Sequence, residues 1–523
     1  MKRLTTTTLM LGLMAGGAVN LTAGTPKIVV GIVVDQLRTD YLEQLRPYFG
    51  NNGFNRLIGE GVYIQDLDFK GAAKDAPTGT AIVYTGAWPT INGVASAEKL
   101  DPALKRNVPV LSSDASKSRT EYTPENIRLS TISDEIFINN GPLTKIYSLT
   151  GDPQVAVISA GHAGTSAIWF DESTGRWTSP NYYGTLPPAI GNKNRTSPLS
   201  SKITSTVWRP LYPASRYQES KVWSDPDFSY GFSGANRDTY SRFKQSAPFN
   251  AEITDAAIDL LKTVQTGGKD LPGMLNVEYT LAPITFDYEG DNRPELIDSY
   301  VRLDSEIGKL LDAIDRDYGK GNSLVFLTSS GYAEEPAIPD ADAKIPTGEI
   351  TLKKAESLLN SYLSAAYGNA DYVTLIRDGK VYLEEKVATG KGIDIKKLRE
   401  EAKNFLLKMG GVSEAFTIDE LLRAESPRLQ NMALGMDPKN APDLILLFTP
   451  GWTVTDDNVY PSESKKVRMA NPATPAFIMA PGVAPETITY AVDATTLAPT
   501  ITSLLRIRAP NGAASKPLRL MQN

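Results

Sequence analysis

The chain of 523 residues has no cysteine and a single histidine, His162. Without cysteine it can form no disulfide, thiolate zinc site, iron–sulfur cluster or cysteine nucleophile. With one imidazole it can form no multi-histidine transition-metal site, and any catalytic triad has only His162 as its base. These absences exclude most thiol and transition-metal chemistry.

The chain also lacks an excess of basic charge. It has 54 Lys and Arg against 60 Asp and Glu, a net charge of −6 that is spread evenly, so we expect no nucleic-acid partner. A hydrophobic share of 41% with 22% charged residues is ordinary for a globular protein with a sizeable core. The length predicts several domains or one large α/β core with insertions.

Long apolar runs are absent beyond the N-terminus. Residues 1–24 combine the basic Lys2 and Arg3, an apolar stretch at 9–19 and small residues at 21–24, the pattern of a secretory signal peptide. A buried N-terminal helix is the alternative. We expect an exported protein of the periplasm or cell envelope, with no transmembrane segment after signal cleavage. A chain without cysteine suits such an oxidising compartment.

Strand-like and helical segments alternate from residue 27 onward. Apolar runs typical of strands occupy residues 28–34, 275–280, 323–328, 443–448 and 475–479. Residues 37–58 and 299–314 have the composition and periodicity of helices. This alternation predicts an α/β fold with a doubly wound sheet. Asp35 follows the first strand, at the sheet edge where such folds place ligands.

Two stretches interrupt the alternation within the expected mature domain, residues 25–523. Residues 172–250 are rich in Ser, Pro, Asn, Tyr and Trp and predict a loop-rich insertion on the ligand side of the sheet. Residues 345–430 follow a helix, hairpin, helix pattern that predicts a small α+β cap.

Aromatic and acidic residues near these stretches have two interpretations. The aromatics either pack the insertion, which we favour, or form a stacking or sugar-binding surface. They are Trp169, Trp177, Tyr182, Tyr183, Trp208, Tyr212 and Tyr217. Glu334 and Glu335 fit a solvated loop better than a pair of ligands.

Several short motifs, in their order and spacing, resemble the alkaline phosphatase superfamily. The similarity is nearest to the nucleotide pyrophosphatase/phosphodiesterase branch and to bacterial alkaline phosphatases with a threonine nucleophile. The motifs are 31–38 (GIVVDQLR), 77–86 (PTGTAIVYTG), 89–94 (PTINGV), 160–163 (AGHA), 169–171 (WFD), 287–291 (DYEGD), 299–304 (SYVRLD) and 493–500 (DATTLAPT). The resemblance spans about residues 27–518. It implies an alkaline-phosphatase-like sheet sandwiched by helices, and phosphoester hydrolysis with two zinc ions held by three Asp and three His.

Most of the zinc ligands that the resemblance implies are missing. The first-strand Asp is Asp35, and the Asp-x-x-x-His motif keeps Asp287 but has Asp291 in place of the histidine. Residues 328–331 read TSSG where the family has an Asp-His pair, and no histidine follows residue 448. We therefore expect no zinc pair. The three Asp are either remnants or, with Glu289 nearby, a site for Mg²⁺ or Ca²⁺.

The position of the nucleophile is ambiguous. Read forward from Pro77, the motif places the family threonine at Thr80; read backward from Gly86, it places the position at Ala76. Four residues are about one helical turn, so a deletion could keep both anchors in phase and put Thr80 at a helix N-terminus. Without zinc or a base beside it, a threonine hydroxyl is a poor nucleophile.

The positions that recognise phosphate in the family are also altered. Asp152 and Gln154 stand where the resemblance implies Lys-x-Arg, and Ala97 stands where it implies Asn. These residues would weaken or repel a dianionic phosphate. His162 lies in a segment that is structural in the family, so we expect it to pack or to form a hydrogen bond.

Three functions are open. The leading hypothesis is an exported pseudoenzyme that binds or scaffolds an unidentified envelope protein or ligand, without a cofactor. The alternative is a phosphoester or sulfoester hydrolase with an oxygen-ligated Mg²⁺ or Ca²⁺ site and Thr80 as nucleophile. A purely structural envelope component with an empty cleft is the third.

Overall fold

The structure, a computed structural model, describes residues 24–113, 121–213, 216, 228–264, 271–281, 293–334, 347–458, 462–467 and 471–522. Asp287, Glu289, Asp291, Glu335, Tyr217 and the expected signal peptide up to residue 23 lie outside them. Within these ranges, no helix is both long and apolar enough to cross a membrane.

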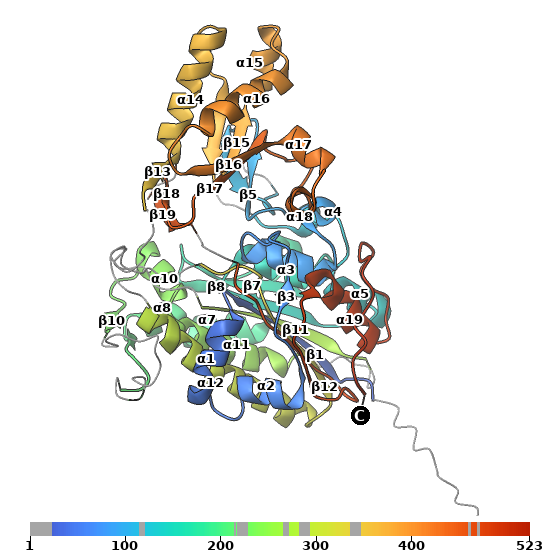
Figure 1. Cartoon of the computed structure of the whole chain (residues 1–523). Helices are drawn as coiled ribbons and strands as arrows, with labels where there is room; N and C mark the ends of the chain where they lie inside the picture. The colour runs from blue at the N-terminus through green and yellow to red at the C-terminus, as the bar shows by residue number, and fades with distance from the viewer. Residues whose placement is uncertain are drawn as a thin grey trace, which may run out of the picture.

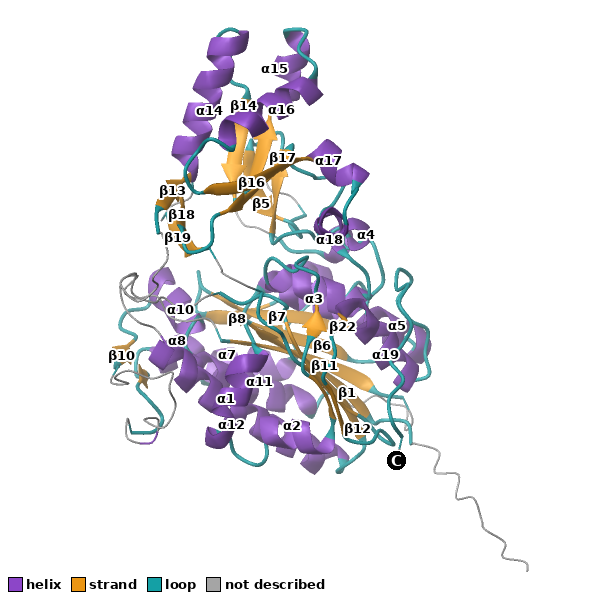
Figure 2. Ribbon diagram, in the orientation of Figure 1, coloured by secondary structure: helices purple, strands orange, loops and turns teal. Residues whose placement is uncertain are grey.

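A nine-stranded sheet forms the centre of the larger lobe (Figures 1 and 2). Its order is β21 (Glu486–Ile488), β2 (Val62–Ile64), β20 (Ala476–Met479), β12 (Ser323–Ser329), β1 (Ile28–Asp35), β11 (Gly273–Thr280), β6 (Ile146–Thr150), β7 (Ser166–Asp171) and β8 (Arg176–Thr178). The five strands from β12 to β7 are parallel, whereas β20 and β8 pair antiparallel with their inner neighbours. The expected α/β fold is confirmed, as a mixed rather than purely parallel sheet.

Helices cover both faces of this sheet (Figure 2). One face carries α1 (Thr39–Leu45), α2 (Phe54–Glu60), α7 (Pro188–Thr196), α8 (Leu199–Ile203), α10 (Arg237–Lys244), α11 (Ala247–Leu261) and α12 (Arg293–Tyr318). The other carries α3 (Ala76–Thr85), α5 (Ile132–Asn140), α6 (Pro153–Ala160) and α19 (Leu497–Leu504). In β1, Val30 and Ile32 join the first core and Val29 and Val33 the second, which explains the continuous apolar run.

The segment 37–58 is not one helix. It divides into α1, a 3-10 turn (Arg46–Tyr48) and α2. Pro47 and the turn that follows interrupt it, and the Asp304 carboxylate accepts hydrogen bonds from Gly50 N and Phe54 N, both at 2.7 Å. A Cβ at Gly53 would lie 2.2 Å from Asp304 O, so the close approach to α12 requires glycine there.

A smaller lobe carries a second, four-stranded sheet in the order β14 (Val373–Arg377), β15 (Lys380–Leu383), β17 (Leu444–Phe448) and β16 (Val412–Thr417). Its helices are α14 (Leu352–Tyr367), α15 (Glu385–Gly390), α16 (Ile395–Leu406), α17 (Ile418–Arg423) and α18 (Pro427–Leu434). Figure 1 shows this lobe above the main sheet. Residues 443–448 were expected among the strands of the main sheet, but β17 pairs with β15 and β16. Its side chains alternate between buried and half-buried, as in a strand with one covered face.

Short strands complete the two lobes. They are β3 (Leu67–Asp68) with β22 (Val492–Asp493), β4 (Glu98–Asp101) with β5 (Arg106–Pro109), β9 (Val207–Trp208) with β10 (Tyr230–Gly231), and β13 (Glu349–Thr351), β18 (Thr453–Asp456) and β19 (Glu463–Lys466). The hairpin of β4 and β5 reaches the smaller lobe, where Arg377 Nε donates to Glu98 Oε2 at 2.8 Å. Lys105 and Glu384 form a second ion pair between the lobes at 2.7 Å.

Several aromatics of the 172–250 stretch belong to the core. Trp177, Tyr183 and Trp208 are buried, whereas Tyr182 is exposed. Trp208 Nε1 donates to Asp298 Oδ2 and Leu211 N donates to Asp298 Oδ1, both at 2.6 Å. Packing is therefore confirmed for the three buried rings.

We predict that Asp298→Ala lowers the free energy of unfolding by about 3 kcal/mol, because it leaves buried donors without an acceptor. Asp298 is fully buried and also accepts from Arg302 Nε at 2.7 Å. Urea denaturation followed by tryptophan fluorescence measures the loss. Asp312→Ala on the same helix is the control, with an expected change within about 0.5 kcal/mol because its side chain is 57% exposed. Equal losses in both variants would contradict the prediction.

Candidate functional site at the carboxyl edge of the central sheet

The carboxyl ends of the parallel strands gather polar side chains at one edge of the main sheet. In the strand register, Asp35 at the end of β1 pairs with Thr280 of β11, and Val34 pairs with Ser329 of β12. Ser330 follows directly. The candidate site therefore lies where open α/β sheets bind ligands.

Asp35 is bonded to a serine of the neighbouring strand end. Ser330 Oγ donates to Asp35 Oδ1 at 2.7 Å, and Gln36 N donates to Ser330 Oγ at 3.4 Å. Removal of water by the surrounding protein raises the pKa of Asp35 to about 7; the Ser330 bond opposes this rise, and the charge of Glu334 adds to it. The carboxyl therefore titrates near neutral pH.

Helix α3 packs directly on the end of β12, where the family pattern has its Asp-His pair. Ser329 and Ser330 are fully buried there. A Cβ at Gly79 of α3 would lie 1.6 Å from Ser330 O, so helix backbone and strand end are in direct contact. No additional atom fits between them.

Thr80 does not begin a helix, so that expectation is wrong. Helix α3 begins at Ala76, with Asp75 as its N-cap, and it ends at Gly86, whose φ is 64°. Thr80 lies in the second turn, is fully buried, and its hydroxyl donates to Ala76 O at 2.7 Å. The helix starts a turn earlier because Asp75 caps it and Pro77 fits its first turn. The N-terminal place belongs to Ala76, the position reached by reading backward from Gly86.

Asp75, which belongs to none of the family motifs, is the main acceptor at this helix end. Its Oδ1 accepts from Thr78 N at 2.9 Å and from Thr78 Oγ1 at 2.6 Å, and its Oδ2 accepts from Ala97 N at 2.6 Å. The sequence signal was an Asp directly before a Pro-containing helix start, a capping pattern.

Asp152 and Gln154, which stand at the Lys-x-Arg position, both form hydrogen bonds to backbone groups of the protein. Asp152 caps α6, and its Oδ1 accepts from Gln154 N at 2.6 Å and Val155 N at 3.1 Å. Gln154 Nε2 donates to Ala97 O at 3.0 Å, and Gln154 Oε1 accepts from Leu111 N at 3.1 Å. These side chains therefore hold loops in place.

Further charged groups surround Asp152. Glu278 Oε2 accepts from Gly151 N at 3.1 Å and Asp152 N at 3.0 Å. Burial, and then the charge of Asp152, raise the pKa of Glu278 well above its usual range. Lys244 of α10 pairs with Glu172, and burial lowers the Lys244 pKa less than these acidic neighbours raise it. Glu278 was hidden inside an apolar strand run and Lys244 inside the insertion, so neither carried a motif.

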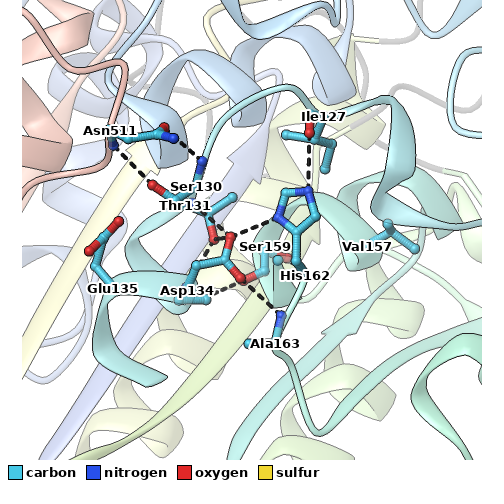
Figure 3. A network of polar contacts seen from close by, with 12 residues as sticks. Ile127, Ser130, Thr131, Asp134, Glu135, Val157, Ser159, His162, Ala163 and Asn511 are labelled. Carbon is cyan, nitrogen blue, oxygen red and sulfur yellow. Dashed lines mark hydrogen bonds and ion pairs between the residues drawn. The ribbon is translucent and has the colours of Figure 1, made fainter. Parts of the chain in front are cut away.

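The described residues do not fit the zinc pair that the resemblance implies. They contain no group of three or more His, Cys, Asp or Glu that could hold a metal. Asp35 is bonded to Ser330, and the place of the Asp-His pair holds the buried Ser329 and Ser330. Because Asp287 and Asp291 lie outside the described ranges, a Mg²⁺ or Ca²⁺ site including them stays a prediction. His162 lies between α6 and β7, with both ring nitrogens bonded to protein (Figure 3).

Relatives and solved structures match nearly the whole chain. Alkaline phosphatase PhoV of Synechococcus elongatus is 28% identical over 95% of this chain and 92% of that protein. Alkaline phosphatase PafA of Elizabethkingia meningoseptica is 26% identical over 94% of both chains. The fold matches a crystal structure of wild-type alkaline phosphatase PafA with a TM-score of 0.81 and 24% identity, covering 94% of this chain and 98% of that chain.

The family described as type I phosphodiesterase / nucleotide pyrophosphatase matches residues 29–471. The resemblance inferred from the motifs is therefore confirmed, and this chain belongs to the type I phosphodiesterase / nucleotide pyrophosphatase family, within the alkaline phosphatase superfamily.

Proposed function

We propose that this protein is a catalytically inactive member of its family that acts as a binding or scaffold protein in the cell envelope. The main support is that its own carboxylates occupy the anion-binding positions of the site. A helix N-terminus binds phosphate through free backbone N–H groups and its dipole. At α3 and α6 the side chains of Asp75 and Asp152 already accept from these groups.

The altered recognition residues support the same proposal. Gln154 bridges Ala97 and Leu111 through both Nε2 and Oε1, so its amide serves the two loops and, unlike a guanidinium, offers a phosphate no bidentate cationic fork. The Thr80 hydroxyl donates to Ala76 O within α3, and the side chain of Asp35 is bonded to Ser330, so among the described residues Thr80 has no bonded base that would activate it as a nucleophile. Export to the periplasm or envelope is part of the proposal and rests on the signal-peptide pattern of residues 1–24.

We expect no turnover of aryl phosphate mono- or diesters by the purified protein, with or without added Zn²⁺, Mg²⁺, Mn²⁺ or Ca²⁺. The physical reason is the lack of an activated nucleophile. The assay uses PafA or PhoV as the positive control and Thr80→Ala as the matched variant, which should behave like the unaltered protein. Metal-dependent turnover that Thr80→Ala abolishes would contradict the proposal and support the hydrolase alternative.

We further predict that Asp75→Ala uncovers a phosphate-binding position. The variant frees Thr78 N and Ala97 N, so millimolar inorganic phosphate should raise its thermal midpoint, while the unaltered protein should show no response. Loss of the cap should itself cost about 1 kcal/mol of stability.

Asp394→Ala provides the control for this experiment. Asp394 caps α16 in the smaller lobe and accepts from Lys396 N at 3.0 Å. Its removal should therefore lower the stability by a similar amount, through loss of a helix cap, without altering the candidate site. If phosphate stabilises the unaltered protein as much as Asp75→Ala, the carboxylate does not block the site and this support for the proposal is lost.

A further inference from the structure

His162 connects three segments of the main lobe (Figure 3). Its Nδ1 lies 3.0 Å from Asp134 Oδ2 in α5, and its Nε2 lies 3.0 Å from the carbonyl oxygen of Ile127. The histidine itself follows Gly161, at the C-terminal end of α6. The ring therefore joins the end of α6 to α5 and to the turn that follows Pro124–Asn126.

Both partners of the ring are acceptors. A backbone carbonyl has no proton to give, and Asp134 already accepts from Thr131 N at 2.9 Å, Thr131 Oγ1 at 3.1 Å and Ala163 N at 2.9 Å. A neutral imidazole has only one N–H, so it can satisfy only one of the two contacts. Both are satisfied only when the ring carries two protons and a positive charge.

We propose that His162 is a proton-operated clamp. In its charged form it holds the end of α6 against α5 and the turn at Ile127, and loss of the proton in alkaline medium releases this joint. The inference goes beyond the proposed function and holds whether or not the cleft is catalytic.

The clamp connects to the candidate site through the two segments that it fixes. Helix α6 begins at the site with Asp152 and Gln154, and Gln154 Oε1 accepts from Leu111 N. The segment before the Ile127 turn is fixed to the same loop, because Asn126 Nδ2 donates to Val110 O at 2.7 Å. Release of His162 therefore loosens both supports of residues 110–111, the segment bonded to Gln154 and Asn126.

The electrostatic surroundings favour the charged ring. The hydrogen bond to Asp134 raises the pKa of His162 above its ordinary 6.5, burial opposes this, and the charge of Asp134 adds to the rise. Tyr182 and Tyr183 face this segment from Asn181–Tyr183; Tyr182 Oη donates to His162 O at 3.1 Å, and Tyr183 Oη donates to Gly161 O at 2.7 Å. The turn Pro124–Asn126 contributes the acidic side chain of Glu125, and α6 itself has no charged residue.

The remaining charges near α5 belong to a separate pair. Glu135 is buried and accepts from Arg508 Nε at 2.8 Å, so its charge is balanced by that of Arg508. Burial raises the pKa of Asp134, but the bond and charge of His162 and the backbone N–H groups of Thr131 and Ala163 together lower it below its usual value, so the carboxylate is the form that faces the charged ring.

Because His162 is the only histidine, its titration can be read without assignment. Proton and carbon NMR of the imidazole Cε1–H, on protein without a polyhistidine tag, should show one resonance titrating above pH 6.5. Titration at or below 6.5 would overturn the clamp.

The stability of the fold should follow the same proton. A raised pKa contributes stability that is fully present below the unfolded value and is lost as pH rises through the folded value. The thermal midpoint of the unaltered protein should thus exceed that of His162→Gln by about 2 °C at pH 6, and the difference should shrink toward pH 9.5. Tyr182→Phe is the matched control, because it removes the contact to His162 O but keeps the titrating ring. It should keep this pH dependence.

Hydrogen exchange tests the connection to the site. At pH 6, peptides covering residues 108–113 and 153–161 should exchange more slowly in the unaltered protein than in His162→Gln, and at pH 9.5 the two should be equal. Comparison at equal pH removes the intrinsic pH effect on exchange. A midpoint difference that is independent of pH, or equal exchange of both proteins at pH 6, would show that His162 is only a packing residue.

Discussion

The direct contact between helix α3 and the end of β12 determines the arrangement of the whole carboxyl edge. Only glycine fits at position 79, because any Cβ there would collide with Ser330 O. With the helix in this place, its N-terminus faces the edge, and the Asp75 side chain accepts from Thr78 N of its first turn. The same placement directs the Thr80 hydroxyl back to Ala76 O inside the helix.

Several carboxyl groups lie together at this edge, and hydrogen bonds of different kinds stabilise them. Asp35 has a serine hydroxyl and a pKa near neutrality, whereas Asp75 and Asp152 accept from helix-end N–H groups. Glu278 accepts from the N–H groups of the turn before α6, and Lys244 supplies a positive charge nearby. An unpaired buried charge would be costly, so these partners offset the cost of gathering acidic groups at this edge.

The sequence predicted the parts of the fold that depend on local pattern. The alternation of strands and helices and the end of β1 at Asp35 follow from apolar periodicity. The sequence could not predict which sheet a strand joins, because that depends on tertiary pairing. The run at 443–448 has the pattern of any buried strand but joins the second sheet. The start of α3 was also missed, because the family motif drew attention to Thr80 and away from the cap at Asp75. Glu278 and Lys244 could not be found, because their meeting depends on the packing of α10 against the sheet and not on spacing.

The position of β17 in the second sheet sets the order in which the smaller lobe can assemble. It is the last strand of that sheet along the chain, yet it lies between β15 and β16, which are synthesised before it. Until residue 448 is available, β15 and β16 have no neighbour on their facing edges, and the helices α14 and α16 have no complete sheet to cover. Formation of this sheet is therefore a late, non-local event, and the nascent lobe exposes unpaired strand edges until the chain has returned.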